Sequence, residues 1–251
     1  DMLDLSFEKI QDLRYGENPH QRAAFYRENG KSGQIVDLKQ LQGKELSFNN
    51  ILDLNAAVEL IKEFPSSPAA VIVKHNNPCG VSQDPKLEKA YLNAWRCDKL
   101  SAFGGIVALN RRLDIKTARL IIKSGFLECI IAPGYDKNAL DIFKGKKSLR
   151  ILEIGNLDPI KELDFKRVGQ GLLMQEKDSS SLDLNNLKVV TKKSPTNTQM
   201  ESLIFGWKVA KHVKSNAIVL TKGKRTVGIG AGQMSRVDSV IVAKNKAKKE
   251  A

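Results

Sequence analysis

The sequence predicts an α/β fold, because segments with helical periodicity alternate with short apolar runs. Residues 50–62 place apolar side chains on one face and predict a helix, with Ser47 as a candidate cap. Residues 69–73, Ala-Ala-Val-Ile-Val, then form a continuous apolar run, which suits a strand buried on both faces of a parallel sheet. With 251 residues, 41% of them hydrophobic, the chain can bury a sizeable core.

The same alternation continues through the middle of the chain. We expect a helix from Asp84-Pro85 to about residue 96, followed by a strand at 105–109. A second helix begins at 114 and ends at Gly125, and a buried strand follows at 129–132. Asp136 then caps a helix that continues through residue 143. Helices that follow each strand are typical of α/β architecture.

The pattern weakens between residues 145 and 186, where short strands are expected near 150–154 and 171–174. We therefore predict two units, residues 1–186 and residues 187–251, the second incomplete. Thr196 and Gln199 match a capping box ahead of a long amphipathic helix. A strand pair at 217–220 and 226–229 follows, and a final helix opens at Ser235 and continues to the end of the chain.

Composition limits the classes of protein to consider. No apolar run approaches the roughly 18 residues of a membrane span, and the first residues lack the layout of a signal peptide. Three widely spaced cysteines indicate neither a disulfide framework nor a paired zinc knuckle, so we expect a cytoplasmic protein. The formal net charge of +13 indicates an anionic partner, either nucleic acid or a small anionic substrate, unless it is only a solvated basic surface.

Lys74 and His75 end the apolar run, at the position where open α/β sheets bind ligands. Histidine can accept a proton near neutral pH, and a neighbouring lysine can stabilise developing negative charge. A solvated turn with a basic tip explains the spacing equally well. A zinc deaminase signature would need a glutamate at Asn77 and a cysteine at Ser82, so we predict no catalytic metal.

Other segments are weaker candidates. Gly104 precedes a strand and lets backbone approach a ligand, although a tight turn is the simpler interpretation. Residues 228–236 form a glycine-rich passage from strand to helix that can present amides to an anion, but they lack a dinucleotide or P-loop pattern. Arg14 suits a phosphate and Tyr15 a heterocycle, although a surface turn explains this segment about equally well. Asn216 orients a substrate or caps a turn, and His212 is expected to be solvated near a helix C-terminus.

Several ordered segments together resemble one family, the formyltransferase domain of AICAR transformylase/IMP cyclohydrolase, the bifunctional purine-biosynthesis protein. The matching segments are 13–21 (Leu-Arg-Tyr-Gly-Glu-Asn-Pro-His-Gln), 41–50, 73–80, 101–105, 130–136, 207–216 and 228–236. The resemblance implies transfer of a formyl group from 10-formyltetrahydrofolate to the 5-amino group of AICAR. It also implies cytidine-deaminase-like α/β/α units without zinc, the first complete and the second incomplete, and a homodimer with a shared active site.

By this resemblance each site residue receives a role. His75 is the proton acceptor, Lys74 stabilises the transition state and Asn216 orients the reacting groups. The nucleotide contacts are Arg14, Tyr15, Gly104, Glu128 and Arg236, and Val237 lies against the folate. The cyclohydrolase domain that precedes the Arg14 motif in the family is not in this sequence, so we expect no ring-closing activity here.

Two alternatives remain open. The lysine clusters at 144–150, 188–193 and 208–224 suggest a basic nucleic-acid-binding module, but only 6% of residues are aromatic and no stacking pattern accompanies the lysines. The other alternative is an inactive nucleotide-binding fragment. Binding of AICAR, folate or duplex DNA distinguishes these possibilities. No partner in a membrane is expected.

Overall fold

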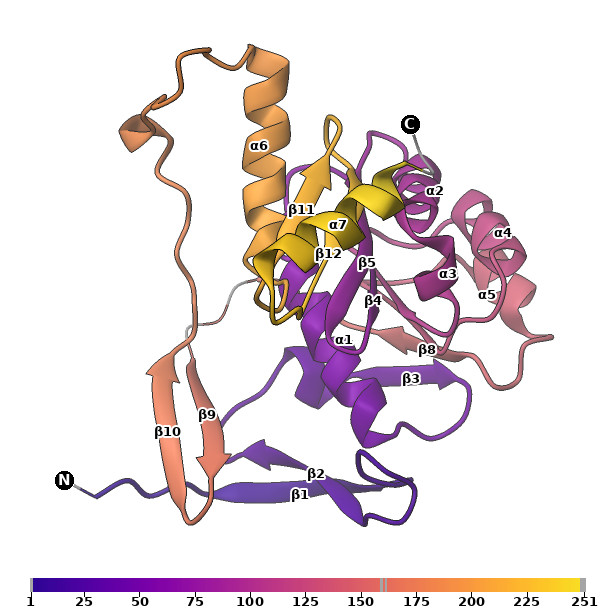
Figure 1. Ribbon diagram of the computed structural model, residues 1–251. Coiled ribbons are helices and arrows are strands. Elements are labelled where there is room, and N and C mark those ends of the chain that lie inside the picture. The colour runs from indigo at the N-terminus through magenta and orange to yellow at the C-terminus, as the bar shows by residue number, and fades with distance from the viewer. Residues whose placement is uncertain (1, 159, 161, 249–251) are drawn as a thin grey trace.

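The computed structural model describes residues 2–158, 160 and 162–248. Its centre is a six-stranded mixed sheet with the order β3-β8-β7-β6-β4-β5 (Figure 1). The strands are β3 (Lys39–Gln42), β4 (Ala69–Lys74), β5 (Asn77–Gln83), β6 (Ile106–Leu109), β7 (Cys129–Ala132) and β8 (Arg150–Glu153). The predicted mixture of helices and strands in one α/β fold is confirmed.

The predicted parallel setting of residues 69–73 is wrong. Strands β6, β7 and β8 are parallel, but β4 runs antiparallel to both of its neighbours, β5 and β6. The reason is the short turn at His75 and Asn76, which makes β4 and β5 a hairpin, and strands joined so tightly must be antiparallel. Residues 69–73 are all apolar because both faces of the sheet are covered, whatever the direction of the strand.

Helices cover the two faces of the sheet. Along β4, Val71 and Val73 pack with α1 (Phe48–Ile61), whereas Ala70 and Ile72 pack on the opposite side with α2 (Leu87–Cys97), as the alternation of strand side chains requires. The second face also carries α4 (Ile115–Lys123) and α5 (Lys137–Phe143). The short helix α3 (Lys99–Ala102) precedes β6. Two hydrophobic cores thus hold the sheet between them.

Several helices begin at the capping residues that the sequence predicts. Ser47 and Asn50 form a reciprocal capping box at α1, and Thr196 and Gln199 form another at α6 (Asn197–Ala210). Asp136 is the N-cap residue of α5 as predicted, but its carboxylate makes no capping hydrogen bond and instead accepts one from Arg112 (2.9 Å). The final helix is α7 (Arg236–Ala247), and its predicted last residues, 249–251, lie outside the described residues.

The predicted strand pair forms the hairpin of β11 (Ile218–Thr221) and β12 (Thr226–Gly230), which lies beside β5. The backbone N–H of Gln83 donates to the carbonyl of Lys224 (2.8 Å), and that of Val81 donates to the hydroxyl of Thr226 (2.9 Å). The order helix, hairpin, helix in α1-β4-β5-α2 recurs in α6-β11-β12-α7. These contacts join the C-terminal elements to the edge of the central sheet.

Helix α7 packs directly on the backbone of β12. A Cβ added at Gly228 would lie 2.1 Å from the carbonyl oxygen of Ala243, and one added at Gly230 would lie 2.0 Å from that of Ser239. Both distances are far below van der Waals contact, so the two glycines are required for this close approach.

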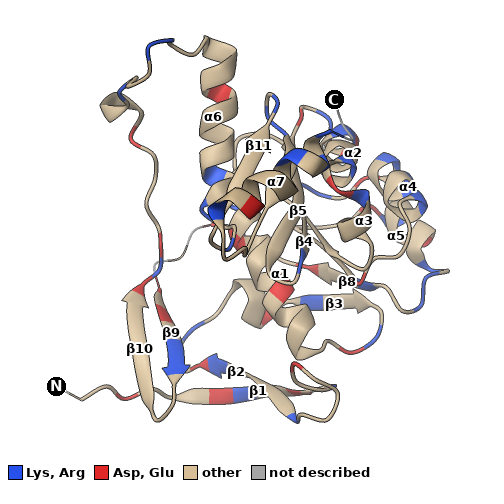
Figure 2. Ribbon diagram, in the orientation of Figure 1, with Lys and Arg blue, Asp and Glu red and all other residues tan. Residues whose placement is uncertain are grey.

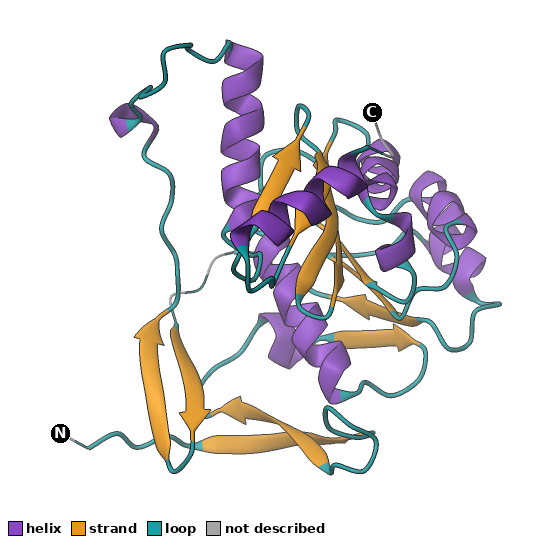
Figure 3. Cartoon of the chain, in the orientation of Figure 1, coloured by secondary structure: helices purple, strands orange, loops and turns teal. Residues whose placement is uncertain are grey.

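Two further hairpins lie apart from the central sheet (Figure 3). They are β1 (Phe7–Leu13) with β2 (Ala23–Glu28), and β9 (Leu163–Val168) with β10 (Gly171–Glu176); short 3-10 turns occur at Gln34–Asp37 and Leu184–Asn186. Of these strands only β10 was predicted. Among the described residues, every helix is too short or too polar to cross a bilayer.

Candidate active site

The turn at His75 has an unusual backbone. His75 and Asn76 have φ angles of 52° and 59°, in the left-handed region that non-glycine residues seldom adopt. Asp53, from the second turn of α1, accepts hydrogen bonds from both of their backbone N–H groups, at 3.1 Å from His75 and 2.6 Å from Asn76. The turn is therefore fastened to α1, while the side chain of His75 stays exposed.

Lys74 points from the same turn toward the loop before β6. Its Nζ donates to the carbonyl oxygen of Phe103 (2.7 Å), next to Gly104. Gly104 has a φ of 73°, and a Cβ added there would lie 3.9 Å from Nζ of Lys74. The structure thus brings Gly104 beside Lys74.

Glu128 lies next to this loop, because its backbone N–H donates to the carbonyl of Gly105 (3.0 Å). Its carboxylate pairs with the buried guanidinium of Arg150 at 2.6 Å, and Arg150 also donates to the carbonyl of Glu45 (2.9 Å). Arg150 was not predicted, because a single arginine in an apolar strand carries no signal of its partner. The ion pair orients Glu128 at the end of the sheet where β6 and β7 begin, next to the loop that carries Gly104.

Arg14 and Tyr15 form a separate cluster at the N-terminus of α1. The backbone N–H of Phe48, the first residue of α1, donates to the carbonyl of Tyr15 (3.2 Å), and the guanidinium of Arg14 lies 5.3 Å from the Tyr15 ring centroid. The positive end of the helix and the guanidinium are both suited to a phosphate.

Asn216 lies beside the start of α7. Its side-chain amide donates to the carbonyls of Gln233 (2.9 Å) and Met234 (3.1 Å), and its own carbonyl accepts from the hydroxyl of Ser239 (2.7 Å). Arg236 and Val237 open α7, and Val237 is 66% exposed. The structure therefore brings these three predicted residues into one region.

Asn77 joins that region to the His75 turn. Its Oδ1 accepts from the backbone N–H of Lys214 (2.9 Å), and its Nδ2 donates to the carbonyl of His75 (3.1 Å). Asn77 thus links the turn of Lys74 and His75 to the loop of Asn216. Among the described contacts, Arg14 and Tyr15 are connected to that turn only indirectly, because both clusters bond to α1.

Comparison with known proteins adds to this geometry. The family model described as the AICARFT/IMPCHase bienzyme matches residues 1–246. The chain belongs to this family. The bifunctional purine biosynthesis protein PurH of Thermoanaerobacter sp. (strain X514) is 57% identical over 237 residues, and that of Magnetococcus marinus is 53% identical over 249 residues.

These alignments cover 94% and 97% of the chain, but 46% of each relative, so the chain spans about half the length of the curated relatives it matches. Among solved structures, Acinetobacter baumannii RibD, form 1, is 20% identical with a TM-score of 0.29, covering 40% of this chain and 33% of RibD. That similarity is too low to support an argument.

In this member of the AICARFT/IMPCHase family, the prediction that His212 is solvated is wrong. Helix α6 ends at Ala210, and the His212 ring is partly buried, with Nε2 3.1 Å from Oε1 of Glu63. Lys211 Nζ lies 3.0 Å from the same oxygen. Burial raises the pKa of Glu63, but the hydrogen bonds from His212 and Lys211 outweigh it, so the net shift is downward.

Charge in this family member is distributed over separate elements. Figure 2 shows Lys and Arg on α2, α4 and β3, and Asp and Glu on α1 and β1. Within the described part of the chain, no cluster of three or more His, Cys, Asp or Glu side chains could hold a metal ion.

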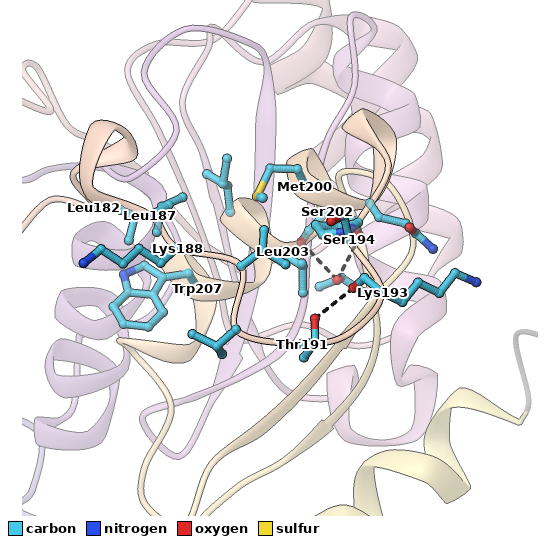
Figure 4. A pocket seen from close by; sticks show the side chains of 16 residues that line it. Leu182, Leu187, Lys188, Thr191, Lys193, Ser194, Met200, Ser202, Leu203 and Trp207 are labelled. Atoms are coloured by element: carbon cyan, nitrogen blue, oxygen red, sulfur yellow. Dashed lines mark hydrogen bonds between the residues drawn. The ribbon is translucent and has the colours of Figure 1, made fainter.

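A cavity of about 740 Å³ lies away from the predicted residues, between α6 and the segment 182–195 (Figure 4). Its lining is mainly apolar and includes Met200, Leu203 and Trp207. None of the predicted site residues lines it. The cavity therefore does not belong to the candidate active site of this family member.

Proposed function

We propose that this chain is the AICAR formyltransferase part of a bifunctional purine-biosynthesis protein. It transfers a formyl group from 10-formyltetrahydrofolate to the 5-amino group of AICAR, in the synthesis of IMP. The observation that carries the proposal is the Lys74–His75 turn, anchored by Asp53 and linked through Asn77 to the loop of Asn216, in a chain of this family.

The chemistry needs a base because the amine of AICAR is a poor nucleophile, its lone pair being delocalised into the imidazole carboxamide. His75 accepts a proton from the amine as the new N–C bond forms at the formyl carbon. Lys74 stabilises the negative charge that develops on the formyl oxygen. The bond between the formyl carbon and N10 of the folate then breaks, and N10 receives the proton, so that atoms and charges balance. Asn216 orients the reacting groups.

The remaining predicted residues bind the substrates. Arg14 and Tyr15 at the N-terminus of α1 suit the nucleotide, because the helix end and the guanidinium both attract a phosphate. Gly104 and Glu128 contact the nucleotide beside Lys74, and Arg236 contacts it from α7. The exposed side chain of Val237 offers an apolar contact to the folate.

The proposal extends to architecture and assembly. The order helix, β-hairpin, helix occurs twice along the chain and supports cytidine-deaminase-like units. Asn77 and Ser82 stand where a zinc deaminase signature would need a glutamate and a cysteine, so we propose units without zinc. The protein would be cytoplasmic and form a homodimer with a shared active site. Sedimentation of the protein with and without AICAR tests the assembly.

The experiment is His75→Ala, assayed in this chain and in a protein of its relatives' full length that contains it. We expect kcat to fall by about 10²–10⁴-fold while the Kd for AICAR stays within about tenfold, because the change removes proton transfer. His20→Ala is the matched control, since His20 is also an exposed histidine and takes no part in the hydrogen bonds that hold the turn.

The outcomes separate the alternatives. Retained turnover would remove His75 from the mechanism. AICAR binding without transfer by the chain, alongside transfer by the full-length protein, would make the chain an inactive nucleotide-binding fragment. Tight duplex DNA binding that weakens steeply with salt, without AICAR binding, would favour the nucleic-acid-binding alternative.

A further inference from the structure

The backbone N–H and carbonyl of His75 are each bonded to a side chain, one from α1 and one from the start of β5. Asp53 accepts from its N–H, and Asn77 donates to its carbonyl. Asp53 also accepts from the N–H of Asn76, the other residue of this turn with positive φ. Each of the two N–H groups of the left-handed turn thus donates to a different oxygen of the Asp53 carboxylate.

Asp53 is well placed to hold this turn. It lies on α1 next to Leu54, which is fully buried, and α1 also inserts Ala57 and Val58 into the core. Within the described part of the chain, the carboxylate has no cationic partner in an ion pair, and both of its hydrogen bonds go to the turn. A carboxylate that accepts backbone N–H groups makes charge-assisted hydrogen bonds, which are stronger than neutral ones.

We propose that Asp53 is a positioning residue for His75, and this inference rests on the proposed formyl transfer. The direction of the His75 side chain follows from its backbone conformation, which L residues avoid without compensating contacts. Without Asp53 the two N–H groups turn toward water and the turn relaxes. A base must lie within about 2.6–3.2 Å of the atom whose proton it takes, so a displacement of about 1 Å is costly.

The test uses Asp53→Ala, which removes both acceptors, and Asp53→Asn, which keeps one. We expect Asp53→Ala to lower kcat by about 10²-fold with KM for AICAR within about threefold, because the base is displaced and the nucleotide contacts remain. Asp53→Asn should recover part of the loss. Asp114→Ala is the matched control: Asp114 also accepts a backbone N–H, from Thr117 at the start of α4, and should leave kcat unchanged.

A double-mutant cycle tests whether Asp53 acts through His75. If it does, Asp53→Ala has no further effect on kcat when His75 is already alanine, because no base remains to be displaced. A general structural role lowers kcat by the same factor in both backgrounds, and that result would overturn the proposal.

A second readout does not depend on activity. The chain has three histidines, so the imidazole NMR spectrum contains signals from His20, His75 and His212, which single substitutions assign. We expect Asp53→Ala to move the His75 signals and leave those of His20 and His212 in place. Asp114→Ala should move none of the three. Unmoved His75 signals would contradict the positioning role.

The failure of this inference differs from the failure of the proposed function. If His75→Ala leaves kcat unchanged, formyl transfer by His75 is refuted, whatever Asp53 does to the spectrum. If His75→Ala abolishes turnover but Asp53→Ala keeps kcat within about twofold, the proposed function stands and Asp53 is not a positioning residue. Thermal melts of all variants establish that each is folded.

Discussion

The close packing of α7 on β12 makes Gly230→Ala a sharp test of the fold around the candidate site. The new methyl group would lie 2.0 Å from the carbonyl oxygen of Ser239, whereas ordinary contact begins at 3.4 Å. The φ of Gly230 is outside the left-handed range, so alanine meets no backbone strain there. The clash is with backbone, which cannot rotate away as a side chain can. Helix α7 must therefore move away from the strand.

The size of the effect follows from that distance. The gap is short by about 1.4 Å, and overpacking a well-packed site costs typically 1–3 kcal/mol. Because the obstacle is a helix backbone, we expect the upper end, about 3 kcal/mol. For a chain of this size, about 2–4 °C in Tm per kcal/mol gives a fall of about 6–12 °C. The shift also moves Arg236, the proposed nucleotide contact, so we expect AICAR binding to weaken.

The measurement is a calorimetric melt, compared with Gly145→Ala. Gly145 has nothing within 4 Å of an added Cβ and no positive φ, so alanine there should leave Tm unchanged or raise it slightly. Melting of Gly230→Ala within about 2 °C of the Gly145 variant would refute the packing argument, since it would mean a cost below about 1 kcal/mol.

Two further predictions concern contacts near the site. Asn77→Ala removes the hydrogen bonds to His75 and Lys214, so it should lower the free energy of unfolding by about 1–3 kcal/mol and should also lower kcat. Unchanged urea unfolding and an unchanged kcat would contradict this prediction. Glu63→Gln should reduce stability at pH 7. Because the folded pKa of Glu63 is lowered, its contribution is present above the unfolded pKa of about 4.3 and is lost as pH falls. In urea unfolding, the stability difference between the unsubstituted protein and Glu63→Gln should be smaller at pH 3.5 than at pH 7. An equal difference at the two pH values would argue against the pairing of Glu63 with His212 and Lys211.

Local signals predicted the helices well. Ser47, Thr196 and Ser235 each begin a helix in the structure, because a cap needs only a side chain and a backbone N–H three residues away. Strand direction was harder, since it depends on connections. The β4-β5 hairpin was hidden because its turn consists of His75 and Asn76 rather than the glycine that usually marks positive φ.

In the candidate site too, some residues could be predicted from the sequence and others could not. Lys74 and His75 were recognisable because reactive side chains at the end of an apolar run stand out in a sequence. Asp53 and Arg150 were not, because their roles depend on contacts 22 residues or more away along the chain. His212 was misjudged for the same reason, since its partner Glu63 is 149 residues distant.

Helix α1 touches three parts of the candidate site along its length. Tyr15 meets its first residue, Asp53 in its second turn holds His75, and Glu63, just beyond its end, pairs with His212 in the loop that leads to Asn216. Its 14 residues extend about 21 Å, and its inner face is locked in the core. One rigid helix therefore sets the spacing between Tyr15, the proposed base His75 and the loop of Asn216. A substitution that tilts α1 would displace all three parts of the candidate site together.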